Sequence, residues 1–187
     1  MKKSAEREGL NVIGGVEITS SEEVHILALL DDEENLFSLQ KIIYDHLPGL
    51  NDERRFGEQV VANEDDEVLD FNTRLLIGAT ELSIDDIVRI IHKLNGLAIA
   101  AHIDRESFSI IGQLGFIPQG LQLDAVEVSA RGNVEDFKHI VFPIITSSDA
   151  HKLDDIGSRV TGFCMEDVNL EEMKKSLLGQ DGRKVII

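Results

Sequence analysis

Cysteine, positive charge and long apolar runs are all scarce in this sequence of 187 residues. Its single cysteine, Cys164, cannot form an internal disulfide, and the apolar neighbours in GFCM predict a small buried side chain rather than a nucleophile. Acidic residues outnumber lysine and arginine by 35 to 18, which gives a formal charge of −17. Such a surface repels a phosphate backbone unless bound metal reverses the sign locally, so general affinity for nucleic acid is not expected.

No apolar run is long enough to cross a bilayer, and the opening MKKSAEREGL lacks the apolar core of a signal peptide. We therefore expect a cytoplasmic protein with no membrane partner. The sequence shows no internal repeat, low-complexity tract or linker, and its length suits one hydrophobic core. Residues 1–187 are predicted to form a single domain.

Short apolar runs alternate with segments of helical periodicity. Strands are expected at residues 12–19 (VIGGVEIT) and 24–29 (VHILAL), followed by a helix that ends at Pro48-Gly49. Ser83 should cap a helix that runs to Asn95, and LAIAAH after it has the continuous apolar character of a strand buried on both faces. The remaining predicted elements are strands in DAVEVS, VFPIITSSDA and RKVII, helices at 133–139 and 169–178, and a hairpin insertion at 58–72. This alternation predicts a parallel α/β sheet or barrel with right-handed crossovers.

Several common catalytic motifs are missing. The sequence has no G-x-S-x-G elbow, and Ser147-Ser148 lies before a predicted strand end, which argues against a serine hydrolase triad. It also has neither G-x-x-x-x-G-K-[ST] nor G-x-G-x-x-G, so nucleotide-dependent chemistry is not indicated.

Polar side chains within or at the ends of the predicted strands are the candidates for chemistry. Glu17 and His25 lie inside apolar strands, His102 ends LAIAAH, and Asp149 and His151 end IITSSDAH. Sites of α/β proteins form at strand ends, and this nitrogen and oxygen ligand set suits zinc, manganese or iron. A lone strand histidine such as His25 is more often a hydrogen-bonded core residue, and Asp149 has an alternative as a helix cap. Such side chains occur at all four of these strand positions, since Asp149 and His151 share one, and this coincidence favours a metal site.

These motifs resemble the PHP family, named for bacterial DNA polymerases and histidinol phosphatase: GVEIT with VHILAL after it, LAIAAHIDR, and ITSSDAH followed by DDIG. The resemblance implies a distorted (β/α)7 barrel that holds two or three divalent metals at its C-terminal face and hydrolyses phosphoesters. It implies that Glu17 bridges two metals and that His25, His102, Asp149 and His151 are further ligands.

The departure from the family pattern is a missing N-terminal portion. PHP domains open with His-x-His and then a Thr-Asp-His-like motif, and neither occurs here. We therefore expect a barrel that lacks its first two strands and binds fewer metals than a complete family member.

Two functions from different classes follow. The first is a metal-dependent phosphoesterase in which metal lowers the pKa of an attacking water. Arg105 and Lys152 are candidate phosphate ligands. Asp104 is a candidate to orient a ligand histidine. Surface ion pairs are the alternative for Arg105 and Lys152. The second is a catalytically crippled module that self-associates through an open barrel edge or binds a partner. The acidic surface favours a small phosphorylated molecule or a short oligonucleotide over long duplex DNA.

Overall fold

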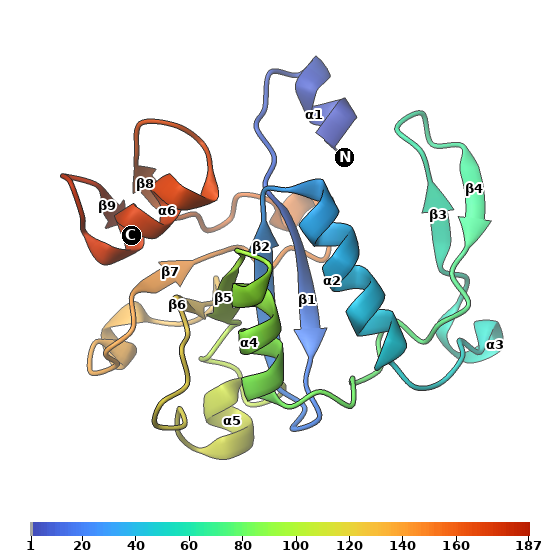
Figure 1. The fold of residues 1–187 in the computed structure, drawn as a ribbon, viewed down its shortest axis with the longest axis horizontal. Coiled ribbons are helices and arrows are strands. Elements are labelled where there is room, and N and C mark those ends of the chain that lie inside the picture. Colours follow the sequence, from blue (N-terminus) through green and yellow to red (C-terminus); the bar gives the residue numbers. More distant parts are fainter. Residues whose placement is uncertain (1) are drawn as a thin grey trace.

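The computed structural model describes residues 2–187 and shows a mixed α/β fold (Figure 1). In chain order the elements are α1 Lys2–Arg7, β1 Gly14–Thr19, β2 His25–Leu30, α2 Glu33–Asp45, α3 Glu53–Phe56, β3 Val60–Ala62, β4 Val68–Phe71, α4 Ile84–Lys93, β5 Leu97–Ala100, α5 Ile110–Leu114, β6 Ala125–Val128, the 3-10 helix η1 Val134–Phe137, β7 Ile144–Thr146, the 3-10 helix η2 Leu153–Asp155, β8 Gly162–Cys164, α6 Leu170–Leu178 and β9 Lys184–Ile186. Among residues 2–187, no helix is both long and apolar enough to cross a membrane.

The main sheet has five strands in the order β1-β2-β5-β6-β7. Strand β2 runs antiparallel to both β1 and β5, whereas β5, β6 and β7 are parallel to one another. A tight turn imposes the reversal between β1 and β2. In this turn the buried Ser20 hydroxyl accepts a hydrogen bond from the backbone N–H of Val24, and Glu23 adopts a positive φ of 60°.

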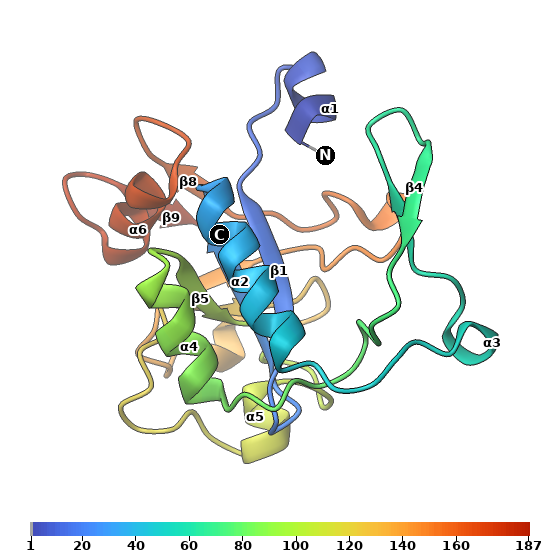
Figure 2. The same cartoon turned by 45° about the vertical axis from the view of Figure 1, so that its right-hand side comes forward.

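Each face of the sheet is covered by helices. Helices α2 and α4 lie over one face (Figures 1 and 2), where Ile87 and Ile91 of α4 pack with Ala98 and Ala100 of β5 in the larger core cluster. On the opposite face Ile99 of β5 belongs to a second cluster that includes two leucines of α6. Because alternate residues of a strand point to opposite faces, β5 is buried on both sides, as its apolar run predicts.

Two smaller sheets lie outside the main one. Strands β3 and β4 pair antiparallel as a hairpin within residues 58–72, and Figure 1 shows this hairpin standing away from the sheet. The acidic tip of the hairpin meets α1 through ion pairs of Lys3 with Glu64 and of Arg7 with Asp65. Strands β8 and β9 pair antiparallel with each other beside α6.

The predicted (β/α)7 barrel is wrong: within residues 2–187 the sheet is open and does not close. The prediction assumed that every strand is parallel to its neighbours, but the turn between β1 and β2 makes β2 antiparallel, and the main sheet ends at β1 and β7. The last two strands pair only with each other rather than extending the main sheet. Alternation of helices and strands along the sequence therefore did not determine the strand directions.

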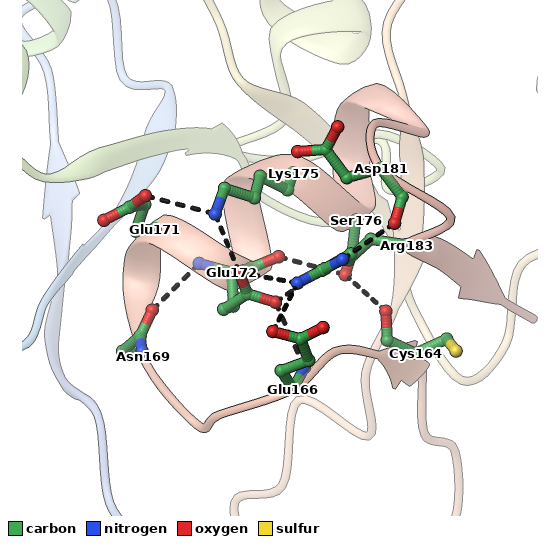
Figure 3. Close-up of polar contacts among 9 residues, drawn as sticks. All are labelled: Cys164, Glu166, Asn169, Glu171, Glu172, Lys175, Ser176, Asp181 and Arg183. Atoms are coloured by element: carbon green, nitrogen blue, oxygen red, sulfur yellow. Dashed lines mark hydrogen bonds and ion pairs between the residues drawn. The ribbon is translucent and has the colours of Figure 1, made fainter.

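A buried carboxylate organises the C-terminal unit (Figure 3). Glu172 on α6 accepts hydrogen bonds from Arg183 and Lys175, each at 2.8 Å, and from the backbone N–H of Glu166. The hydrogen bonds from Arg183, followed by those from Lys175, lower the pKa of Glu172 to about 2. Cys164 on β8 is free and exposed, so the predicted burial of its side chain is wrong.

Candidate metal centre

Strand pairing brings three of the predicted ligands together at one end of the sheet. Because β2 is antiparallel to β1 and β5, the start of β2 lies at the same edge as the ends of those two strands. His25 opens β2 opposite Thr19 of β1, and Glu17 lies two residues before Thr19 on the same face of that strand. His102 follows the end of β5 with a positive φ of 30°. The three side chains thus come from strands β1 and β2 and from the turn after β5.

The ligand atoms of these residues converge. The Nδ1 atom of His25 lies 3.1 Å from Nε2 of His102, and one carboxylate oxygen of Glu17 lies 3.3 Å from each nitrogen. Among residues 2–187 this is the group of three whose ligand atoms all lie within 4.8 Å of one another. Ligand atoms around a tetrahedral ion with bonds of about 2.0–2.1 Å are separated by about 3.3–3.4 Å. The donor set and its spacing therefore fit a divalent metal.

Burial and charge set the protonation of this group. Hydrogen bonds from His102, followed by those from His25, hold the pKa of Glu17 far below its ordinary value against the opposing effect of burial. Burial lowers the pKa of His102, but its hydrogen bond to Glu17 and the negative charge of Glu17 outweigh this effect and raise the pKa overall. The Glu17 carboxylate and the His102 imidazole thus favour each other's charged forms, as a carboxylate beside a cation would.

Asp149 and His151 lie outside this group of three. Asp149, which follows β7 with a positive φ of 46°, forms an ion pair with Arg105. The His151 side chain is 73% exposed, and its Nδ1 lies 2.9 Å from the backbone oxygen of Asp149. Their role as metal ligands stays a prediction.

The roles expected of the other three sequence candidates stay predictions. Arg105 pairs with Asp149, and Lys152 is an exposed residue that precedes η2. Asp104, proposed to orient a ligand histidine, accepts hydrogen bonds of 2.7 Å from both the backbone N–H and the hydroxyl of Ser129. It therefore joins the segment after β5 to the segment after β6.

Glu127 is a buried acid at the centre that was not among the five predicted metal ligands. It lies in β6, is 5% exposed, and accepts a hydrogen bond of 3.4 Å from the backbone N–H of His102. Burial raises its pKa, although donors that include the Ser147 hydroxyl oppose this rise. Glu127 thus connects the strand end that carries His102 with the segment that leads to Asp149. A single charged residue in the apolar run AVEV is the signal that identifies it.

Comparisons with known proteins show the fold. No protein-family model matches the chain. Over 105 residues, 51% of this chain, it is 30% identical to the uncharacterized protein YqxK of Bacillus subtilis (strain 168), of which the match covers 27%. Two solved structures of Endonuclease Q are similar in fold. The lesion-specific endonuclease PfuEndoQ of Pyrococcus furiosus matches with a TM-score of 0.70 and 17% identity, over 92% of this chain and 40% of that chain.

The second solved structure is Endonuclease Q in complex with a 27-mer duplex that has an abasic lesion at the active site. It matches with a TM-score of 0.62 and 16% identity, over 91% of this chain and 40% of that chain. The chain thus spans well under half the length of each of these proteins. The similarity shows that over most of its length this chain shares its fold with part of Endonuclease Q.

Proposed function

We propose that this chain is a metal-dependent phosphoesterase that cleaves phosphodiesters of nucleic acid. The observation that carries the proposal is the convergence of Glu17, His25 and His102 at one end of the sheet. The fold shared with Endonuclease Q supports it, because those relatives are described as a lesion-specific endonuclease and as acting on a DNA duplex. A divalent metal bound by the three residues would supply positive charge to the phosphoryl oxygens and activate water.

The surrounding residues hold the ligands in place. His102 is 3% exposed in its side chain, and its backbone N–H is bound by Glu127, so its ring has little freedom to move. Glu17 is 42% exposed and stays ionised because its pKa is lowered, which keeps a negative ligand available across the neutral range. Arg105 beside Asp149 is proposed to contact a non-bridging phosphate oxygen through its planar guanidinium.

The net charge of the chain did not predict its substrate class well. The expectation that long duplex DNA is an unlikely partner finds no support, because one neighbour in fold is bound to a 27-mer duplex. The overall charge of −17 acts over the whole surface, whereas a bound cation changes the sign where the phosphate enters. The main sheet is open and ends at β1 and β7, and self-association through an open edge stays a prediction.

The alternative is a catalytically crippled module that acts through self-association or a partner. It is favoured by one observation: only three predicted ligands converge, while Asp149 pairs with Arg105 and His151 faces solvent. Such a module would bind metal weakly and would not turn over a phosphodiester.

The test is hydrolysis of bis(p-nitrophenyl) phosphate and of a labelled oligonucleotide with manganese, zinc or EDTA. We expect activity that requires metal and falls at least a hundredfold in Glu17→Gln and His102→Gln, since each change removes one of about three ligands that a catalytic metal needs. The control is His139→Gln, which changes an exposed histidine outside the candidate centre. Hydrolysis that persists in EDTA or in Glu17→Gln would refute the proposal, and metal binding without hydrolysis would favour the alternative.

A further inference from the structure

A cavity of about 810 Å³ opens directly beside the candidate metal centre. His25 and His102 line it, and its other walls include Phe108, Phe137 and Arg131; we call it the aromatic cavity. Its volume lies in the range of about 300–1,000 Å³ that is typical of pockets for small organic ligands. A phosphate group bound at the metal would leave most of this space empty, so the cavity accommodates a larger part of the substrate.

The walls of the aromatic cavity are fixed before any ligand binds. On one side, residues 103–109 are folded back by a hydrogen bond of 2.5 Å from the Ser109 hydroxyl to the Arg105 backbone oxygen. The next residues pack so closely that a Cβ added at Gly112 would lie 2.3 Å from the Glu106 backbone oxygen. The backbone oxygen of Phe108 accepts a hydrogen bond of 2.8 Å from the N–H of His25. This wall is therefore tied to the strand that carries a metal ligand.

The opposite wall is the segment from Ser129 to Asn133. Asp104 binds Ser129 twice, and Arg159 donates hydrogen bonds to the backbone oxygens of Ser129 and Gly132. A Cβ added at Gly132 would lie 2.6 Å from the carboxylate carbon of Asp104, so the segment packs directly on that side chain. The two walls are thus joined through Asp104, and a ligand would meet a preorganised surface.

Phe108 presents an aromatic surface within this cavity. Its ring stacks on the His25 ring with centroids 4.8 Å apart and planes 20° apart, and it is 42% exposed. It is held there by a backbone with a positive φ of 58°, which is unusual for a bulky residue. An exposed aromatic in a strained conformation beside a candidate centre indicates a contact with a ligand rather than a packing role.

Charge alone does not define the ligand. Arg131 lines the aromatic cavity, is exposed, and forms no ion pair with any residue of the described chain 2–187. Three acids, Asp104, Glu106 and Asp136, line it together with Arg105 and Arg131, so the lining has no strong excess of either sign. The distinctive features are therefore the exposed ring of Phe108 and the guanidinium of Arg131, which has no ion pair within residues 2–187; they match a base and a phosphate.

We propose that the aromatic cavity binds the nucleotide next to the scissile phosphate, with its base stacked on Phe108 and its outer phosphate on Arg131. This inference rests on the proposed function and assigns it a substrate class: nucleic acid that is single-stranded or locally unpaired. A paired and stacked base has no free aromatic surface, so it must leave the duplex to reach Phe108. Phe108 and Arg131 are then specificity residues, and small phosphomonoesters are poor substrates.

The experiment measures binding without metal, in EDTA, by fluorescence anisotropy. The probes are a labelled single-stranded oligonucleotide of about ten nucleotides and an abasic strand of equal length and charge. We expect the strand with bases to bind about 5- to 150-fold more tightly, the range for one stacked base. Phe108→Ala should abolish this preference and Phe108→Tyr should retain it, while Phe116→Ala, which alters an exposed phenylalanine outside this cavity, should change nothing.

Arg131 is tested by salt dependence. Loss of one phosphate contact should lower the slope of log affinity against log salt by about 0.7 in Arg131→Gln, with no change in Arg54→Gln on α3. Equal binding of the two strands by the wild type, or an unchanged preference in Phe108→Ala, would overturn the inference. Bis(p-nitrophenyl) phosphate has no base, so its hydrolysis tests the proposed function alone. If the wild type hydrolyses it but shows no preference for the strand with bases, only the inference about the cavity fails. In Phe108→Ala, hydrolysis of bis(p-nitrophenyl) phosphate and binding of the oligonucleotide could fall by the same factor. That result would also overturn the inference, because Phe108 would then act only through His25.

Discussion

Metal should stabilise the folded chain, because Glu17, His25 and His102 converge only when β1, β2 and β5 are paired. His25 and His102 are 77 positions apart in the sequence, so an unfolded chain does not hold them together. An ion that binds the native state alone adds about 2.7 kcal/mol at a hundred times its dissociation constant. For a chain of 187 residues, about 1 kcal/mol moves the Tm by about 2–4 °C. The expected increase is therefore about 5–11 °C.

The increase should depend on pH with a definite sign. Metal binds the neutral imidazole, and the pKa of His102 is raised above its ordinary 6.5, so protons compete with the ion even at that pH. Without metal, the contribution of His102 to stability has the opposite dependence on pH. The raised pKa of His102 stabilises the fold fully below about 6.5 and less as pH rises through the folded value. The lowered pKa of Glu17 contributes above 4.5 and loses its effect as pH falls. Metal should therefore stabilise the chain most above neutral pH.

Differential scanning fluorimetry with manganese, zinc or EDTA at pH 5.5 and pH 8.0 checks this. We expect a large increase in Tm at pH 8.0, a small one at pH 5.5, and none at either pH in His102→Gln. His139→Gln is the matched control and should behave as the wild type. The reasoning fails if His102→Gln keeps the full increase at pH 8.0, because the ion would then bind elsewhere.

Three further predictions concern residues outside the ligand set. Asp124→Ala should destabilise the fold by about 2–4 kcal/mol in urea unfolding, because it leaves the buried N–H of Ala98 without its partner and removes the contact with His92; a loss below about 0.5 kcal/mol would contradict this. Gly132→Ala should cost about 1–3 kcal/mol and weaken oligonucleotide binding, and wild-type behaviour in both would contradict the rigid wall. Glu172→Gln should make the urea midpoint less dependent on pH between about 4.5 and 2, because the carboxylate stabilises the fold above 4.5 and ceases to do so as pH falls to its folded pKa; an unchanged profile would show that Glu172 does not set acid stability.

The positions of the main helices and strands followed from local sequence signals, whereas the short elements α3, α5 and β8 were not predicted. Ser83 caps α4 and Asn169 caps α6 as predicted, since each side chain accepts a hydrogen bond from the backbone N–H three residues later. The expected strands at 12–19 and 24–29 correspond to β1 and β2, and the apolar run before His102 is buried on both faces. Capping and periodicity depend on neighbours within a few residues, so the sequence contains this information directly.

The architecture did not follow, because strand direction depends on connections and distant pairing. The barrel prediction came from a family resemblance together with regular alternation of helices and strands. Residues 20–23 form a tight turn rather than a crossover, so β2 reverses direction and pairs with β5 antiparallel. One short turn thus changed the topology of the whole sheet without altering the position of any strand.

The centre was only partly predictable for a related reason. His25 was selected as a residue inside a parallel strand, yet it meets His102 because it begins an antiparallel strand whose start lies beside the end of β5. Phe108 had no signal in the sequence, since its exposure depends on a positive φ and on stacking against His25, which is distant in the sequence. Asp149 has a positive φ and forms an ion pair with Arg105, a contact that no pattern of spacing reveals. The residue types that favour metal chemistry can therefore be read locally, whereas the features proposed to select the substrate arise from backbone conformations that only the folded sheet imposes.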